Sequence, residues 1–202
     1  ITACAGASAS FTASASGTGP FSYAWFKGTN LLAGATNSSL VLTNVSTNDA
    51  GTYCVVLTGS CNSATNCATL GVNLPTTLDP LASATNCPGT TRTFTAIANG
   101  SGPFAYQWLK AGAPLTGQTN ASLTLSSIVD SDAGQYSVQV AGACNTATNA
   151  ATLTVLTNLS ATQPADLVLC EGSPASFSTV ASGSGPLAYQ WTKDGEIGRA
   201  HV

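Results

Sequence analysis

The sequence predicts an all-β protein made of tandem β-sandwich repeats of about 83 residues, and three observations support this prediction. The pattern Gly-x-Gly-Pro-x-x-Tyr-x-Trp occurs three times, and its tryptophans, Trp25, Trp108 and Trp191, are spaced by 83 residues. Short runs alternate apolar and polar residues, as half-buried strands do. No stretch has helical periodicity of useful length. A fixed period of this size indicates an array of similar units.

The period divides the chain into two near-complete units and part of a third. We expect a first domain at residues 1–74 with a truncated first strand, and a complete second domain at residues 75–157. A third domain at residues 158–196 should end after its third strand, which leaves the Trp191 face without cover. Residues 197–202 break the repeat and resemble one reading frame of a common sequencing adapter, so we interpret them as an artefactual tail.

The first half of the second unit shows why each element is expected. Residues 81–86 are a first strand, which ends at the turn Cys87-Pro88-Gly89. Residues 91–98 (TRTFTAIA) place Thr, Phe and Ile in short alternation, which is typical of a half-buried strand. Gly and Pro then mark residues 99–103 as a loop.

The strand at residues 105–110 follows, with Tyr106 and Trp108 on one face because side chains alternate along a strand. Residues 111–120 are a loop or a weak edge strand, since Pro114 has no N–H to donate to a ladder.

The second half of the unit completes two facing sheets. Residues 122–126 direct alternate leucines inward, residues 128–134 form a turn, and residues 135–140 and 146–156 are the last strands. Facing sheets bury alternate residues of each strand, and one tryptophan per unit supplies much of that core. About seven strands per unit follow, with the core centred on Trp25, Trp108 and Trp191.

The motif Asp-Ala-Gly-x-Tyr ends at Tyr53 in the first unit and at Tyr136 in the second. It matches the tyrosine corner, in which the Tyr hydroxyl bonds to nearby backbone. With the tryptophan on the third strand, it resembles I-set-type immunoglobulin-like domains, specifically the tandem repeats of large secreted bacterial surface proteins. The resemblance covers residues 1 to about 196 and implies tandem immunoglobulin-like β-sandwiches. Val55 and Val138 stand where the family has its second core cysteine, so the inter-sheet disulfide is absent and apolar packing must replace it.

Composition narrows the classes of partner. Charged residues are 6% of the chain, against roughly 25% in ordinary soluble domains, and the net charge is −3. Ser, Thr, Asn, Ala and Gly give an uncharged, hydrogen-bonding exterior, as on many secreted proteins. The sequence has no basic patch of the kind that binds nucleic acid, so we expect no nucleic-acid partner. No apolar run is long enough to insert into a membrane.

The seven cysteines indicate an oxidising compartment. Cys54 and Cys67 lie equidistant from the turn at residues 59–62, so a hairpin places them opposite each other, close enough to form a disulfide. Their counterparts in the second unit are Ser137 and Ala150, so both partners are replaced together.

The other five cysteines repeat in phase: Cys4, Cys87 and Cys170 precede the second strand of a unit, and Cys61 and Cys144 lie between its last two strands. These turns are at opposite ends of a sandwich, roughly 25–30 Å apart, whereas a disulfide needs Cα atoms within about 7 Å. An inter-domain Cys4–Cys144 bridge, with Cys87 meeting a cysteine of the third unit, is one hypothesis. An intra-domain Cys4–Cys61 pair and free thiols are the alternatives.

We expect no catalytic, cofactor-binding or metal site, and no enzymatic activity in this segment. The only histidine, His201, lies in the suspected tail, so no Ser/His or Cys/His pair is available to activate a nucleophile. Zinc-type CxxC spacing is absent as well. Asp130 and Asp132 are interpreted as turn caps, and Tyr106 with Trp108 as a buried pair instead of a sugar-binding platform.

Three functions fit these features, and fold alone cannot separate them. The first is a non-catalytic structural or adhesive repeat segment, acting as a stalk or spacer in a secreted or surface-anchored bacterial protein. The second is a binding module for a glycan or protein, and the third is an accessory region of a secreted polysaccharide-degrading enzyme. The expected partners are neighbouring repeats and a cell-surface glycan or protein. The loops are similar in all units, which favours the structural role.

Overall fold

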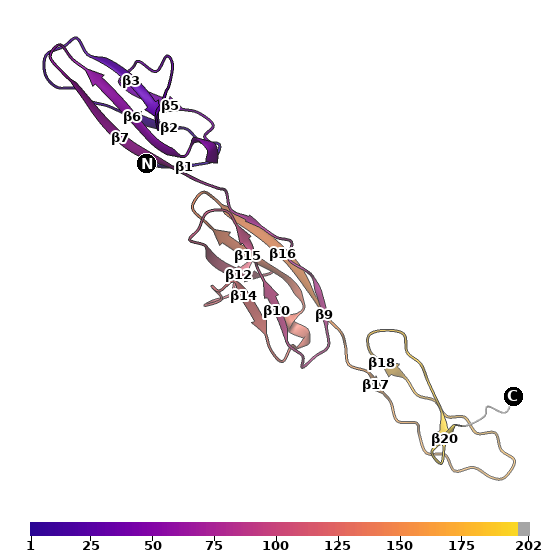
Figure 1. Ribbon diagram of the computed structural model, residues 1–202. Coiled ribbons are helices and arrows are strands. Elements are labelled where there is room, and N and C mark those ends of the chain that lie inside the picture. The colour runs from indigo at the N-terminus through magenta and orange to yellow at the C-terminus, as the bar shows by residue number, and fades with distance from the viewer. Residues whose placement is uncertain (198–202) are drawn as a thin grey trace.

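A computed structural model describes residues 1–197 and shows two β-sandwiches followed by a third region with four short strands (Figure 1). The first domain contains β1 (Thr2–Cys4), β2 (Ala9–Thr12), β3 (Ser22–Lys27), β4 (Asn30–Leu31), β5 (Ser39–Leu42), the 3-10 turn η1 (Thr47–Asp49), β6 (Gly51–Thr58) and β7 (Ser63–Asn73). One sheet has the order β1-β7-β6-β3-β4, and the pair β2-β5 faces it. The predicted all-β fold is confirmed.

The second domain repeats this plan. It contains β8 (Thr77–Leu78), β9 (Ala84–Asn86), β10 (Arg92–Thr95), β11 (Ala98–Asn99), β12 (Ala105–Lys110), β13 (Ala113–Pro114), β14 (Ser122–Leu125), the 3-10 turn η2 (Asp130–Asp132), β15 (Gly134–Ala141) and β16 (Thr146–Val155). The larger sheet has the order β13-β12-β15-β16-β9, and the pairs β10-β14 and β8-β11 lie on the other side of the core.

Two expected strands of the second domain differ from the structure because the chain changes hydrogen-bond partner within them. The expected strand at residues 91–98 is divided into β10 and β11: the first pairs with β14, the second with β8. The expected strand at residues 81–86 keeps only β9, which runs parallel to β16, while β8 lies earlier and on the other sheet. The start of the domain therefore crosses from one sheet to the other.

Each domain has one core centred on its tryptophan. Trp108 is fully buried beside Phe94, at 6.4 Å between ring centroids, and its cross-strand partner on β15 is the buried Val138. Its indole N–H donates to the Asn120 carbonyl at 2.9 Å, so the only polar atom of the ring is satisfied. Trp25 has the same arrangement in the first domain and is 3% exposed.

Trp191 differs from the other two tryptophans and is a correction to the expected set of core residues. It is 46% exposed, and Phe177, the counterpart of Phe94, is 55% exposed. The region contains β17 (Ser160–Ala161), β18 (Ala181–Ser182), β19 (Thr192–Lys193) and β20 (Glu196–Ile197), which form two separate two-stranded pairs. No strand in the described residues 158–197 covers the indole as β15 covers Trp108. Of the suspected tail at residues 197–202, Ile197 ends β20, and the residues from Gly198 on lie outside the described residues.

The tyrosine corner is present in both domains. The hydroxyl groups of Tyr53 and Tyr136 donate to the carbonyls of Asp49 and Asp132, both at 2.8 Å. Lys110 completes the second corner: its Nζ donates to the Ser131 carbonyl at 2.5 Å and lies 5.5 Å from the Tyr136 ring centroid. Lys27, the counterpart of Lys110 in the first domain, likewise donates to the Asn48 carbonyl and lies 5.7 Å from the Tyr53 ring centroid.

Asp49 is a carboxyl group whose pKa is lowered in the folded first domain. The Ser46 backbone N–H and hydroxyl donate to its carboxylate at 2.8 and 2.9 Å, and in that order they hold the pKa of Asp49 below its usual value, with Lys27 adding a smaller effect. A pKa lowered by folding stabilises the domain above the unfolded-state pKa of about 4, and this stabilisation is lost as the pH falls through the folded-state value. We expect Asp49→Asn to weaken the loss of stability between neutral pH and pH 3.

The measurement is urea unfolding at several pH values, with the Trp25 indole NMR signal as the probe of the first domain. Glu171→Gln changes an exposed carboxylate outside this domain and is the matched control. An unchanged acid dependence in Asp49→Asn would show that other groups carry it.

Candidate functional site at the domain joint

A disulfide between Cys4 and Cys144 joins the two ends of the first and second domains that face each other. Cys4 ends β1, Cys144 lies in the turn between β15 and β16, and their Cα atoms are 5.7 Å apart. The disulfide spans a sequence separation of 140 residues. Of the alternatives that the sequence left open, the structure has this inter-domain bridge, and Cys61 is exposed and free.

The linker Leu74–Thr76 is seated on the loops of the second domain by four hydrogen bonds. The Thr76 N–H donates to Asn145 Oδ1 at 2.6 Å, and Asn145 Nδ2 donates to the Thr76 carbonyl at 3.1 Å. The Ser101 backbone N–H donates to the Leu74 carbonyl at 3.2 Å, and the Ser101 hydroxyl oxygen accepts a hydrogen bond from the Leu74 N–H at 2.9 Å. Thr76 is 2% exposed. The linker is therefore part of the joint and not a free tether.

Two glycines allow the linker to approach this closely. A Cβ atom on Gly100 would lie 2.3 Å from the Pro75 carbonyl oxygen, and one on Gly142 would lie 2.1 Å from Thr76 Oγ1. Real Cβ atoms do not approach other atoms so closely, so either side chain would displace the linker. The repeated Gly-x-Gly-Pro loop, which first revealed the period, thus forms the seat of the linker.

Gly100→Ala should disrupt the joint, and Gly17→Ala is its matched control. Both glycines have positive φ, +114° and +116°, so the backbone strain of alanine is similar at both. A Cβ on Gly17 would meet nothing within 4 Å. We expect Gly100→Ala to lower the free energy of unfolding by about 1–3 kcal/mol more than Gly17→Ala, the usual cost of overpacking. If urea titrations give both variants the same loss of free energy of unfolding, Gly100 is not needed for the close approach of the linker.

The remaining cysteines fall into two groups. Cys54 and Cys67 are directly opposite on β6 and β7 and form a disulfide within the first domain, with Cα atoms 4.0 Å apart. Cys61, Cys87 and Cys170 are exposed and free. Cys61 lies in the hairpin turn that matches the turn of Cys144. Cys87 directly follows β9, at the position that Cys4 holds at the end of β1.

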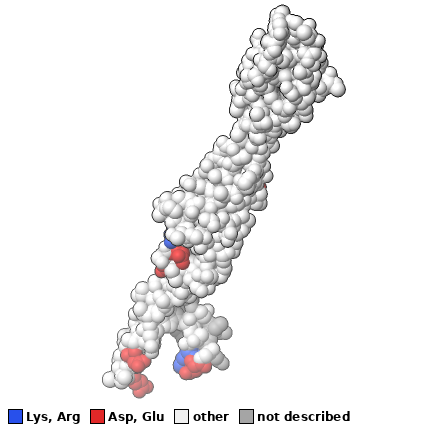
Figure 2. Space-filling model, turned by 90° about the vertical axis from the view of Figure 1, so that its left-hand side faces the viewer, with Lys and Arg blue, Asp and Glu red and all other residues white. Residues whose placement is uncertain are grey.

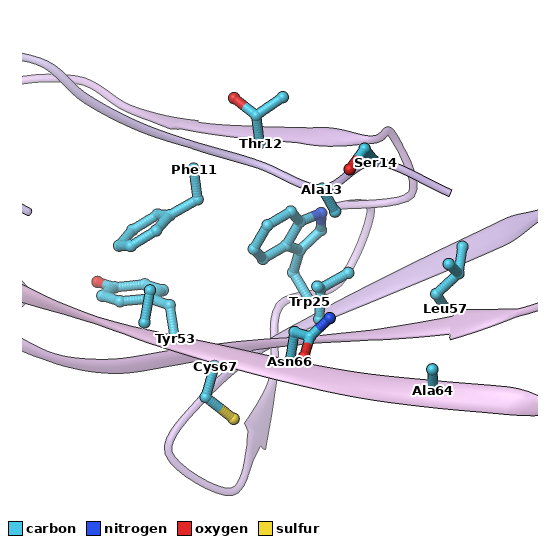
Figure 3. A pocket seen from close by; sticks show the side chains of 12 residues that line it. Phe11, Thr12, Ala13, Ser14, Trp25, Tyr53, Leu57, Ala64, Asn66 and Cys67 are labelled. Carbon is cyan, nitrogen blue, oxygen red and sulfur yellow. The ribbon is translucent and has the colours of Figure 1, made fainter. Parts of the chain in front are cut away.

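A cavity of about 290 Å³ opens between the sheets of the first domain, beside Phe11, Trp25 and Asn66 (Figure 3). In the second domain the segment around Leu78 and Leu81 packs against the equivalent part of the core. The cavity therefore lies where the second domain has a further piece of chain. Because Trp25 is only 3% exposed, its ring offers no open platform for a sugar.

Two further kinds of feature, a metal site and a membrane-spanning helix, were sought in the described residues. Within residues 1–197, no group of three or more His, Cys, Asp and Glu side chains could hold a metal ion. The same residues contain no helix of the length and apolarity that a membrane span requires. On the face drawn in Figure 2, charged atoms form a few small clusters in the lower half of the view, and the rest is uncharged.

Comparison with known proteins defines the class as tandem immunoglobulin-like β-sandwiches. Residues 75–155 match the immunoglobulin I-set domain model. An I-band fragment of titin is 19% identical with a TM-score of 0.80, over 100% of this chain and 79% of that chain. Drosophila OTK, extracellular domains 3–5, is 18% identical with a TM-score of 0.61, over 77% of this chain and 58% of that chain. A chain from the structure of Dpr11 IG1 bound to DIP-gamma is 17% identical with a TM-score of 0.53, over 76% of this chain and 93% of that chain.

Proposed function

We propose that this chain is a non-catalytic stalk or spacer segment, in which immunoglobulin-like repeats are joined end to end as a semi-rigid rod. The observation that carries the proposal is the joint, where a disulfide and a seated linker act together. Contact areas between neighbouring domains are ordinarily small and allow bending, so a rod needs added restraint. The joint also supports placing the boundary between the first two repeats at residues 74 and 75.

We further propose a secreted or surface-anchored location. The two disulfides support it, because such bonds persist in oxidising compartments and are rare in the cytosol. The uncharged, Ser/Thr/Asn-rich exterior is suited to the same setting. We also propose a bacterial source, on the resemblance of the repeats to those of large secreted bacterial surface proteins.

The stiffness of the joint can be measured by energy transfer between two labels. Exposed Val41 and Val129, one on each domain, accept non-cysteine labels without touching either core. We expect a narrow distance distribution in the unreduced protein and a broader one after Cys4→Ser with Cys144→Ser. A distribution that is equally broad in both proteins would contradict the rod. Binding of the unreduced protein to a glycan array would support the alternative role of a recognition module.

A further inference from the structure

The free end of the first domain carries the same set of residues as the end of the second domain that holds the linker. Thr18, Phe21, Gly59, Cys61 and Asn62 are the counterparts of Ser101, Phe104, Gly142, Cys144 and Asn145. In the second domain this set is occupied by the linker and by Cys4. In the first domain it surrounds an open cavity of about 320 Å³.

The glycines of the two ends show the same contrast. A Cβ on Gly142 would strike Thr76 Oγ1 at 2.1 Å, whereas the nearest atoms to a Cβ on Gly59 are 3.4 Å away, and one of them belongs to Phe21. The first domain therefore keeps a cradle for a closely approaching chain, but no chain lies in it.

The cavity between the sheets of the first domain would be filled by the continuation of the same chain. In the second domain, β8 pairs with β11, and the Asp79 carbonyl accepts a hydrogen bond from Asn149 Nδ2 at 2.8 Å. Asn66, the counterpart of Asn149, lines the open cavity of the first domain (Figure 3). One continuous segment, residues 74–81, thus occupies in the second domain both positions that are open in the first.

We infer that the free end of the first domain is a docking site for another repeat of this array. The occupant is an extended segment with the pattern of residues 74–81, and the repeat that delivers it bonds to Cys61 through its cysteine at the Cys4 position. This inference rests on the proposed function and deepens it, because it assigns a further joint and the residues that make it. Oxidation of the two thiols to the disulfide passes their two electrons to an oxidant such as oxidised glutathione.

A second copy of this chain in trans fits the site less well. Its Cys4 is already bonded to Cys144, and its linker is already seated on Ser101 and Asn145. Its free Cys87 precedes a linker that is also engaged, since Thr157 and Ser184 exchange hydrogen bonds. A repeat directly connected to the first domain can offer both the segment and the cysteine.

The test adds residues 1–83 in front of Ile1, which preserves the 83-residue phase and presents a new copy of the segment 74–81 to the first domain. The unreduced protein is folded with a glutathione pair, digested and mapped by mass spectrometry. We expect a peptide that links the added copy's Cys4 to Cys61, together with the original Cys4–Cys144 peptide. Maleimide should then no longer label Cys61.

Gly17→Ala in the extended protein gives a second readout that does not depend on a disulfide. We expect it to become as destabilising as Gly100→Ala, because the added linker now lies over it. A Cys61 that stays reactive while Cys4–Cys144 forms would overturn the docking site and leave the proposed rod intact. Absence of both bridges would overturn the two together.

Discussion

Replacing Trp108 with alanine is expected to lower the free energy of unfolding of the second domain by about 3–5 kcal/mol. The side chain is completely buried, and it lies between Phe94 on one sheet and Val138 on the other. Its removal leaves a cavity at the centre of a small core and leaves the Asn120 carbonyl without its donor. A loss of this size is a large part of the total free energy of unfolding of a small domain.

The measurement is urea unfolding of the full chain, followed by the methyl NMR signals of Val138. Trp191→Ala provides a control within the same molecule, because Trp191 is 46% exposed. Its loss should cost under about 1 kcal/mol, the range of surface substitutions. A loss below about 1 kcal/mol for Trp108→Ala would mean that the indole does not support the core.

The second large effect is expected from Cys4→Ser together with Cys144→Ser. On the chain-entropy model, a disulfide that closes a loop of this length contributes roughly 5 kcal/mol relative to the fully unfolded chain. The variant should therefore lower the free energy of unfolding both domains together, and it should free the joint to bend. Global unfolding in urea, followed by circular dichroism, measures the first effect.

Cys54→Ser with Cys67→Ala is the matched control, since Ser137 and Ala150 already occupy these positions in the second domain. Its loop spans 13 residues, so the model gives roughly 3 kcal/mol, confined to the first domain. The distance between the two domains should not change in this variant. Equal effects of both double variants on that distance would mean that Cys4–Cys144 does not restrain the joint.

The sequence predicted the features that depend on periodicity. Alternation of apolar residues located β12 and β14 closely, and the 83-residue period placed Trp25 and Trp108 at equivalent positions. Strand geometry made a pair of Cys4 with Cys61 difficult and left the joint open as a place for a bridge. These features follow from spacing along one chain.

Two features that depend on contacts between segments were not predicted. The division of residues 91–98 follows from a change of partner strand, which no local pattern encodes. The burial of Thr76 carries no signal in the local sequence, because it depends on hydrogen bonds with Asn145, 69 residues further along the chain. The Gly and Pro residues of the repeated pattern predicted a loop, and the close approach of the linker to Gly100 was not predicted.

Peptide mapping of the unreduced protein is the most direct test of the disulfide between the two neighbouring domains. The protein is alkylated at native pH, digested without reductant and analysed by mass spectrometry. We expect a peptide that links Cys4 to Cys144, and alkylation of Cys61. A peptide that links Cys4 to Cys61 would place the bridge within one domain and contradict the rod.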